Sequence, residues 1–256
     1  MKQMIQDNIY AFYDKIGSTL KTGFFKNPNI SWMNTGNGSW PNMIYNTSVL
    51  EENVDEFVTQ NTITIKSKNA PPFWLIEDNP LDKILAQKLG KAGMRPIMYW
   101  TGMGITVNAP LENNLSKKNT KIKTVSNTSD LNSWTSILNV ALMTSNKIHE
   151  NIFENLYLQD NFELYLVLEN DIPVATGLAY FSNNVCGIYM IATLEEARKK
   201  GFGTAVTKHC INAAHQKGIT NIVLQASQKG VSIYEKMGFN KYCEFNILWM
   251  LGKDFK

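Results

Sequence analysis

A short glycine-containing segment between two apolar stretches constrains the fold of this chain more than any other feature. It begins after the apolar run Ile188–Thr193 and reads Arg198-Lys199-Lys200-Gly201-Phe202-Gly203-Thr204. Apolar residues then recur at helical spacing, at Ala205, Val206, Cys210, Ile211 and Ala214. A strand that passes through a glycine turn directly into a helix is typical of α/β proteins. Because the first turn of a helix presents unpaired N–H groups, and glycine lets the backbone approach a ligand, we expect an anion-binding loop here.

A second strand and helix follow this segment. The strand is expected at Asn221–Ala226, and the short helix after it ends in Tyr234-Glu235-Lys236-Met237-Gly238-Phe239. Turn residues, caps and periodicity predict the remaining elements, with turns expected at Asn170-Asp171 and Asn183-Asn184 and helix caps at Asn79-Pro80 and Thr128-Ser129-Asp130. Helices are expected at 4–20, 50–60, 81–91, 128–143 and 146–157, and strands at 30–33, 43–45, 71–76, 95–106, 121–125, 162–168, 174–181, 185–193 and 243–250. From residue 121 onward the predicted order is β-α-α-β-β-β-α-β-α-β.

These two motifs together resemble those of the GNAT family of acyl-CoA N-acyltransferases. The Arg-x-x-Gly-x-Gly segment is similar to the pyrophosphate loop of that family, and the Tyr-Glu-Lys-Met-Gly-Phe ending is similar to its last helix. The resemblance covers about residues 121–252 and is specific from 188 to 239. It implies an α/β protein with a mixed sheet and the GNAT fold. It also implies a GNAT-type acyltransferase that uses acetyl-CoA as acyl donor and an amine as acceptor.

The resemblance assigns the cofactor-binding residues position by position. The pyrophosphate is expected on the loop and the helix start, formed by Arg198, Lys199, Lys200, Gly201, Phe202, Gly203 and Thr204. The pantetheine amides are expected to pair with the main chain of Ile191, Ala192 and Thr193. Ser227 stands where the family often has an asparagine that contacts the cofactor; the serine hydroxyl could replace that contact, and Gln225 or Gln228 could help. No cluster of ligand residues has metal-binding spacing, and no metal is expected.

Tyr234 is the expected catalytic residue. In the family a tyrosine at this place commonly lies near the thioester sulfur, where it can protonate the departing thiolate. The general base is not identified, because the strand 185–193 has no carboxylate where many relatives carry a glutamate. Glu195 and Glu196 follow that strand and are expected to be solvated charges, whereas Tyr189 or a group acting through water could accept the proton. No activated nucleophile is visible, which favours direct attack by the amine.

The chain divides into two expected parts. Residues 1–115 form an N-terminal α/β lobe, residues 121–256 form the GNAT domain, and the polar segment Asn108–Lys121 links them. A helix that stops at glycine and turns into an apolar strand occurs twice, at 85–94 and again before Phe239. This echo suggests that the N-terminal lobe is a degenerate GNAT-like copy. The alternative is that helix-glycine-strand is simply common in α/β proteins.

The N-terminal lobe is expected on the acceptor side of the enzyme. The segment Ser39–Asn46 is rich in asparagine and aromatic residues, and it could cover the cleft and help to form the acceptor pocket. Trp32, Trp40 and Trp74 could offer stacking surface there. An equally good interpretation is that these tryptophans belong to the core.

The composition is that of an ordinary soluble globular protein, with 44% hydrophobic and 18% charged residues among 256. The net charge of +3 is evenly distributed, which argues against a nucleic-acid or anionic-membrane partner. No continuous apolar stretch predicts a membrane span or a signal peptide, so a cytoplasmic location is expected. The three cysteines, Cys186, Cys210 and Cys243, are expected to be buried free thiols.

Three functions are compatible with these observations. The first is an N-acetyltransferase that moves an acetyl group from acetyl-CoA to a primary amine of a small molecule or amino acid, in a ternary complex. The second is a catalytically inactive GNAT-like protein that binds or senses acyl-CoA. The third is a structural pair of lobes that forms a homodimer through an exposed last strand, Cys243–Met250.

Overall fold

The computed structural model describes residues 1–35, 40–112, 119–142, 147–148 and 151–251. Its strands form one mixed sheet in the order β1-β2-β3-β4-β11-β5-β10-β9-β8-β7-β6. The strands are β1 (Phe24–Asn27), β2 (Ile30–Met33), β3 (Met43–Tyr45), β4 (Phe73–Glu77), β5 (Met94–Thr106), β6 (Thr120–Thr124), β7 (Phe162–Glu169), β8 (Ile172–Ser182), β9 (Val185–Thr193), β10 (Asn221–Ser227) and β11 (Asn240–Met250). The mixed α/β architecture confirms the expected fold class.

The helices cover the two faces of this sheet. They are α1 (Lys2–Gly17), α2 (Val54–Lys66), α3 (Pro80–Lys91), α4 (Thr128–Ala141), α5 (Phe202–Gln216) and α6 (Val231–Glu235), with short 3₁₀ turns η1 (Glu51–Asn53) and η2 (Glu195–Ala197). Side-chain caps start two of them. Asn79 caps α3 as predicted, whereas Asn127 caps α4 instead of the expected Thr128-Ser129-Asp130, and each asparagine accepts a hydrogen bond from the backbone N–H three residues later. The predicted turns at Asn170-Asp171 and Asn183-Asn184 have positive φ at both residues, as tight β-hairpins require.

The two halves of the chain repeat one order of elements. The first half runs β1-β2-β3-α2-β4-α3-β5, and the second half runs β7-β8-β9-α5-β10-α6-β11. In both halves the first three strands pair antiparallel and the third pairs parallel with the fourth. This repetition supports the interpretation of the N-terminal lobe as a GNAT-like copy. The expected division at residues 115–121 stays a prediction, because one sheet runs through both halves.

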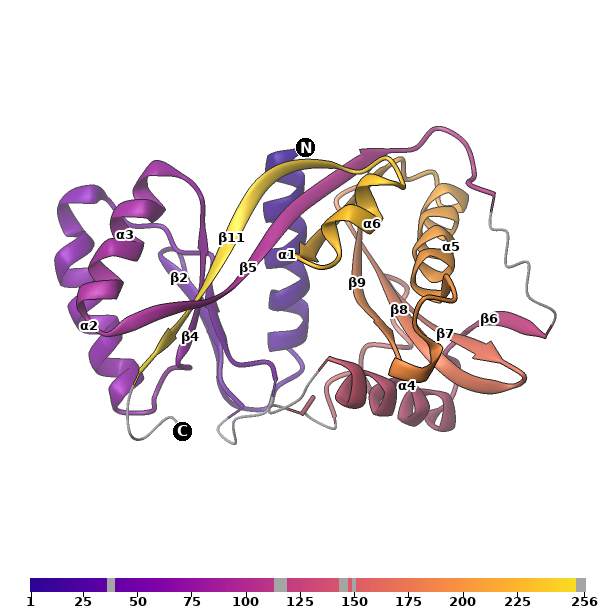
Figure 1. Cartoon of the computed structure of the whole chain (residues 1–256). Coiled ribbons are helices and arrows are strands. Elements are labelled where there is room, and N and C mark those ends of the chain that lie inside the picture. The colour runs from indigo at the N-terminus through magenta and orange to yellow at the C-terminus, as the bar shows by residue number, and fades with distance from the viewer. Residues whose placement is uncertain (36–39, 113–118, 143–146, 149–150, 252–256) are drawn as a thin grey trace.

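Each half gives its last strand to the other. β5 of the first half pairs with β10 of the second, and β11 of the second half lies between β4 and β5 (Figure 1). The prediction that the last strand is an exposed edge is therefore wrong. The alternating pattern of β11 suits an interior strand as well as an edge strand, so the sequence alone could not distinguish these positions.

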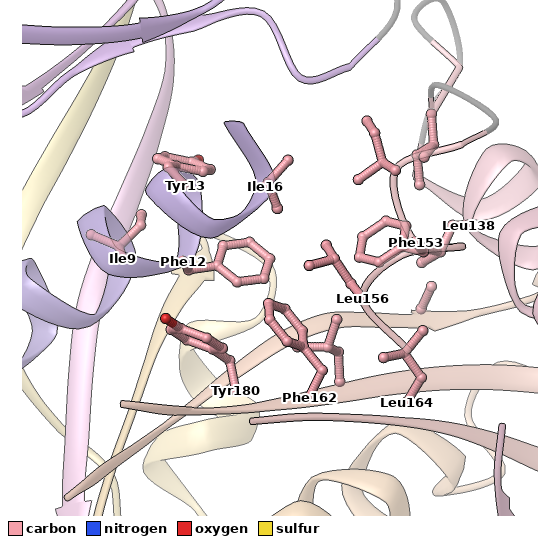
Figure 2. Close-up of a cluster of buried hydrophobic side chains, with 14 of the residues drawn as sticks. Ile9, Phe12, Tyr13, Ile16, Leu138, Phe153, Leu156, Phe162, Leu164 and Tyr180 are labelled. Atoms are coloured by element: carbon pink, nitrogen blue, oxygen red, sulfur yellow. The ribbon is translucent and has the colours of Figure 1, made fainter. Parts of the chain in front are cut away.

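Helix α1 lies between the lobes and packs against the sheet (Figure 1). Its buried face carries Ile9, Phe12, Tyr13 and Ile16, and Phe12 lies among the aromatic rings of the C-terminal half (Figure 2). The Phe12 ring stacks on that of Tyr189 with 4.0 Å between centroids and 3° between planes. This core joins α1 to β7, β8 and β9, and a second core fills the opposite face under α5.

Of the three N-terminal tryptophans, Trp74 belongs to the core, whereas Trp32 and Trp40 are partly buried. Trp74 is fully buried and its Nε1–H donates to Thr47 Oγ1 at 2.9 Å. Trp40 stacks on Phe153, and Trp32 stacks on Phe25. The core alternative is therefore the correct one for Trp74.

Two further expectations change in this part of the chain. In the segment expected to cover the cleft, Met43–Tyr45 is the buried strand β3, whereas Ser39 lies outside the described residues. The expected helix Asn146–Tyr157 is not seen where the structure describes it, because residues 151–157 form consecutive turns. These turns still bury Ile152, Phe153 and Leu156, which explains the apolar periodicity that suggested a helix.

Candidate active site

Strands β9 and β10 separate at one end, as a cofactor site in an open α/β sheet requires. They pair parallel from Asn221 with Val185 to Leu224 with Ile188. Beyond Leu224, β9 pairs only with β8 and β10 pairs only with β5 in the described part of the chain. The residues expected to bind pantetheine, Ile191–Thr193, lie on the separated part of β9.

A β-bulge redirects the side chains of β9 within this split. One extra residue of β9 is inserted between the pairs formed by Leu178 with Tyr189 and by Thr176 with Ala192. Met190 has φ of 52°, and its carbonyl accepts a hydrogen bond from the Thr176 hydroxyl at 2.8 Å. Tyr189 and Met190 consequently both pack against the core under α1, whereas Ile191 packs on the α5 side. Nothing in the sequence around Met190 indicates a positive φ, so sequence reasoning missed this bulge.

The glycine segment forms the turn into α5. Lys199 and Gly201 have φ of 61° and 86°, and Gly201 is the N-cap of the helix. A side chain at Gly201 would meet open space, so the positive φ alone explains the glycine. The turn directs the N-terminus of α5 toward the separated strand ends, with the partial positive charge of the helix dipole there.

Gly203 brings the loop and the end of β9 together. A Cβ on Gly203 would lie 3.7 Å from Ile191 Cγ2 and 3.8 Å from Thr193 Oγ1. The first turn of α5 thus faces the part of β9 expected to bind pantetheine. Two groups of residues that the sequence analysis assigned to one cofactor lie next to each other in space.

Exposed cations surround this helix start. Arg198 and Lys199 are exposed, and Arg198 Nε donates to the Thr193 carbonyl at 3.3 Å. Lys200 forms an ion pair with Glu169 at 2.7 Å, which leaves less of its charge for a ligand. Glu195 and Glu196 are exposed on η2, as expected. The local charge therefore suits a phosphate mainly through Arg198 and Lys199.

Tyr234 lies beside the same helix. It is half-buried on α6, edge-on to Phe239, with 5.8 Å between ring centroids. Its side chain lies close to Thr207, whose hydroxyl donates to the Gly203 carbonyl at 2.8 Å. Burial raises the pKa of the Tyr234 phenol to about 12, which keeps it protonated near neutral pH. A protonated phenol connected to the helix start is suited to act as an acid.

Tyr189 is less suited to act as a base. Its hydroxyl donates to Asn8 Oδ1 at 2.7 Å, and burial raises the pKa of this phenol far above its ordinary value. A phenol that stays protonated cannot take a proton from an ammonium group. β9 has no carboxylate either, so the base remains unassigned.

Ser227 and Gln225 lie on the other side of the split. Ser227 ends β10 opposite Trp100 of β5 and is exposed. The Gln225 Nε2 atom is buried and has no hydrogen-bond partner among the described residues. The sequence analysis named Gln225 only as a possible helper of the Ser227 contact, because an unpaired amide can be recognised only from the packing around it.

The equivalent place in the N-terminal lobe does not suit a phosphate. The start of α2 carries Glu51 and Glu52 before it and Asp55 and Glu56 in its first turn. These charges repel an anion from the helix N-terminus. The ring of Tyr10 from α1 stacks on Tyr45 of β3 nearby, and its hydroxyl donates to Glu77 at the end of β4.

Two cavities lie outside the split. One of about 130 Å³ is lined by Asn8, Val185 and Asn221 at the opposite ends of β9 and β10. The other, of about 290 Å³, is lined by Thr124 of β6, Glu163 and Tyr165 of β7, and His209 and neighbouring residues of α5. Neither includes the residues expected to bind the cofactor.

Comparison with known proteins identifies the fold and the family. Residues 131–239 match the model of the acetyltransferase (GNAT) family. These residues form a domain of the GNAT acetyltransferase family. The match covers α4 to the end of α6 and therefore includes the split, the loop and Tyr234. Family and fold make this GNAT protein a transferase of the N-acyltransferase type.

Solved structures of other GNAT proteins share the arrangement of the whole chain. A GCN5-related N-acetyltransferase from Kribbella flavida has a TM-score of 0.70 at 15% identity, over 96% of this chain and 95% of that one. Another from Sphaerobacter thermophilus has a TM-score of 0.66 at 14% identity, over 86% and 75%. A putative GNAT acetyltransferase from Novosphingobium aromaticivorans has a TM-score of 0.56 at 11% identity, over 94% and 96%. At these identities the likeness shows the fold alone. No curated protein matches the sequence.

The described residues of this protein lack two classes of feature. None of its helices there is long and apolar enough to cross a membrane. No group of three or more His, Cys, Asp or Glu residues in the same ranges could hold a metal ion.

Proposed function

We propose that the protein transfers an acetyl group from acetyl-CoA to a primary amine of a small molecule or an amino acid. The observation that carries this proposal is the convergence of three groups: the N-terminus of α5, the separated end of β9 and the protonated phenol of Tyr234. The first two fit a long cofactor with a phosphate at one end. The third fits the sulfur at the other end.

Different residues would bind different parts of acetyl-CoA. The backbone N–H groups from Lys200 to Thr204 would bind the pyrophosphate, and Arg198 would add charge. The main chain of Ile191, Ala192 and Thr193 would pair with the pantetheine amides, and the Ser227 hydroxyl would contact the cofactor from β10. When bound, acetyl-CoA supplies the thioester whose carbonyl carbon the amine attacks. Tyr234 would then donate its proton to the departing thiolate.

Direct attack in a ternary complex fits the state of the cysteines. All three are free and buried. Burial raises the pKa of Cys243 to about 12 and raises those of Cys186 and Cys210 as well, so none forms a thiolate near neutral pH. An acyl-enzyme on cysteine is therefore disfavoured. Buried reduced thiols also support a cytoplasmic location.

One observation favours a second function, an acyl-CoA-binding protein without catalytic activity. β9 offers no carboxylate, and burial keeps Tyr189 protonated, so the described part of the split has no evident base. Such a protein would bind acetyl-CoA as tightly as an enzyme but would not release CoA in the presence of amines.

The experiment that tests the proposal combines binding with turnover. Acetyl-CoA is titrated calorimetrically into the wild type and into a double variant, Arg198→Glu with Gly203→Val. CoA release is then measured with a panel of amines for the wild type and Tyr234→Phe. The proposal expects binding that is lost in the double variant, and turnover that falls in Tyr234→Phe. Absence of binding by the wild type would refute both functions, whereas binding without turnover for any amine would leave only the second.

A further inference from the structure

The edge of β5 next to the split is apolar and exposed. β10 pairs with β5 only from Thr106 to Trp100, whereas β11 accompanies β5 to Met94. Residues 94–99 of β5 thus have one edge without a strand partner in the described ranges. Ile97, Met98 and Tyr99 on this edge are 47%, 46% and 43% exposed. Consecutive large apolar side chains on an open strand edge are uncommon unless something binds them.

Part of this edge faces the same side of the sheet as the bulge of β9. Residues paired across a sheet point to the same face. Trp100 pairs with Phe245, and Met98 pairs with Ile247, and both partners belong to the core under α1. Tyr189 and Met190 also pack against that core. On the α1 side of the sheet, large apolar side chains of β9 therefore lie on one side of the split, and those of β5 lie on the other.

Gln225 supplies a polar group between them. It lies one residue beyond the last pair of β9 with β10 and pairs with Gly102. A Cβ on Gly102 would contact Ile5 of α1, so Gln225 also lies on the α1 side. Its buried Nε2 has no partner among the described residues. A buried amide N–H is costly until it finds an acceptor, and a carbonyl oxygen of a bound molecule is such an acceptor.

We propose that the acyl acceptor is an α-amino carbonyl compound with a large apolar side chain, bound on the α1 side of the split. Gln225 Nε2 donates to its carbonyl oxygen, and Trp100 and Met98 contact its side chain. The amine then points to the split between β9 and β10. This inference rests on the proposed function, since it names the acceptor class of the same site. It also gives the N-terminal lobe a direct role, because β5 comes from that lobe.

Three amines separate the two contacts. Phenylalaninamide has both features, phenethylamine lacks the carbonyl, and glycinamide lacks the apolar side chain. For the wild type, kcat/KM for phenylalaninamide should exceed that for glycinamide about 10- to 100-fold, as expected for burial of a large apolar side chain. It should exceed that for phenethylamine about 3- to 10-fold, as expected for one hydrogen bond.

Two variants test the assignment of each contact. Gln225→Leu should abolish the preference over phenethylamine and keep the preference over glycinamide. Trp100→Ala should abolish the preference over glycinamide and keep the preference over phenethylamine. Gln87→Leu on the exposed surface of α3 and Phe25→Ala on β1 are matched controls, and both should keep the wild-type preferences.

The outcomes distinguish this inference from the proposed function. CoA release with other amines, but no preference for phenylalaninamide, would refute the inference and keep the acyltransferase. The inference would also be overturned if both variants changed kcat/KM equally for all three amines, because a general structural defect has that effect. No CoA release with any amine would refute the catalytic function itself.

Discussion

Replacement of Gly203 by alanine should raise the stability of the protein and lower its affinity for the cofactor. A Cβ at this place would make ordinary contacts of 3.7 and 3.8 Å with Ile191 and Thr193, so the free protein can accept it. Glycine within a helix costs about 0.5–1 kcal/mol relative to alanine. We therefore expect Gly203→Ala to raise the melting temperature by about 1–4 °C.

Cofactor binding should respond in the opposite direction. The added Cβ would occupy the space between the first turn of α5 and the end of β9, where the proposed cofactor crosses. Loss of one hydrogen bond between a backbone N–H and a charged phosphate costs about 1.5–3 kcal/mol, which corresponds to a roughly 10- to 100-fold higher Kd. Calorimetric titration with acetyl-CoA measures this change, and scanning calorimetry measures the melting temperature.

Gly90→Ala is the matched control. Gly90 lies in α3, and a Cβ there would meet nothing within 4 Å. This variant should gain similar stability without any change in Kd. Wild-type affinity in Gly203→Ala would refute the placement of the cofactor between α5 and β9. A marked loss of stability would show that the contacts of Gly203 are tighter than the structure indicates.

Three further predictions concern stability and assembly. Burial and the nearby Glu77 raise the pKa of Asp82 from 3.8 to about 6. Asp82 therefore contributes about 3 kcal/mol to the free energy of unfolding below pH 4, and this contribution is lost as the pH rises through 6. Asp82→Asn should remove this loss, and parallel curves of melting temperature against pH for both proteins would contradict the assignment. Gly187→Ala would place a Cβ 1.9 Å from Asn8 Oδ1, and thermal unfolding should show a destabilisation of about 1–3 kcal/mol; an unchanged melting temperature would refute the tight packing of α1. A fragment of residues 121–256 should fail to fold because β10 and β11 lose β5, and co-expression with residues 1–115 should restore soluble protein, whereas a folded fragment alone would show that the strand exchange is dispensable.

The sequence predicted well those parts of the fold that depend on local chemistry. β2 and β3 have the expected bounds, the two asparagine turns have the expected conformation, and α5 begins directly after Gly201. Each of these follows from a property of the residues themselves, such as alternation, a tolerance of positive φ or a glycine before an amphipathic run.

The rest of the site depends on contacts between distant segments. The bulge at Met190 is held by Thr176 of a neighbouring strand, and the buried amide of Gln225 is defined by β5 and α1. The place of β11 between β4 and β5 follows from pairing over more than a hundred residues, which no local pattern encodes. Sequence reasoning assigned the cofactor side of the split by resemblance and expected the N-terminal lobe on the acceptor side, but it had no means to find the proposed contacts of Trp100, Met98 and Gln225.

The strand exchange explains why the proposed acceptor contacts could not be predicted from the sequence. In the C-terminal half the strand next to β10 is not the strand that follows it in the chain but β5, which the N-terminal half contributes. β5 is longer than β10 and continues past Ser227, so its residues 94–99 extend the sheet beside the split without a partner on that edge. A self-contained C-terminal domain would have to build this edge from its own last strand. Here both edges of β11 are already paired, with β4 on one side and with β5 on the other. The N-terminal lobe can therefore lose its own anion site, as the acidic start of α2 indicates, and still be needed for the reaction, because the acceptor would be recognised on its strand.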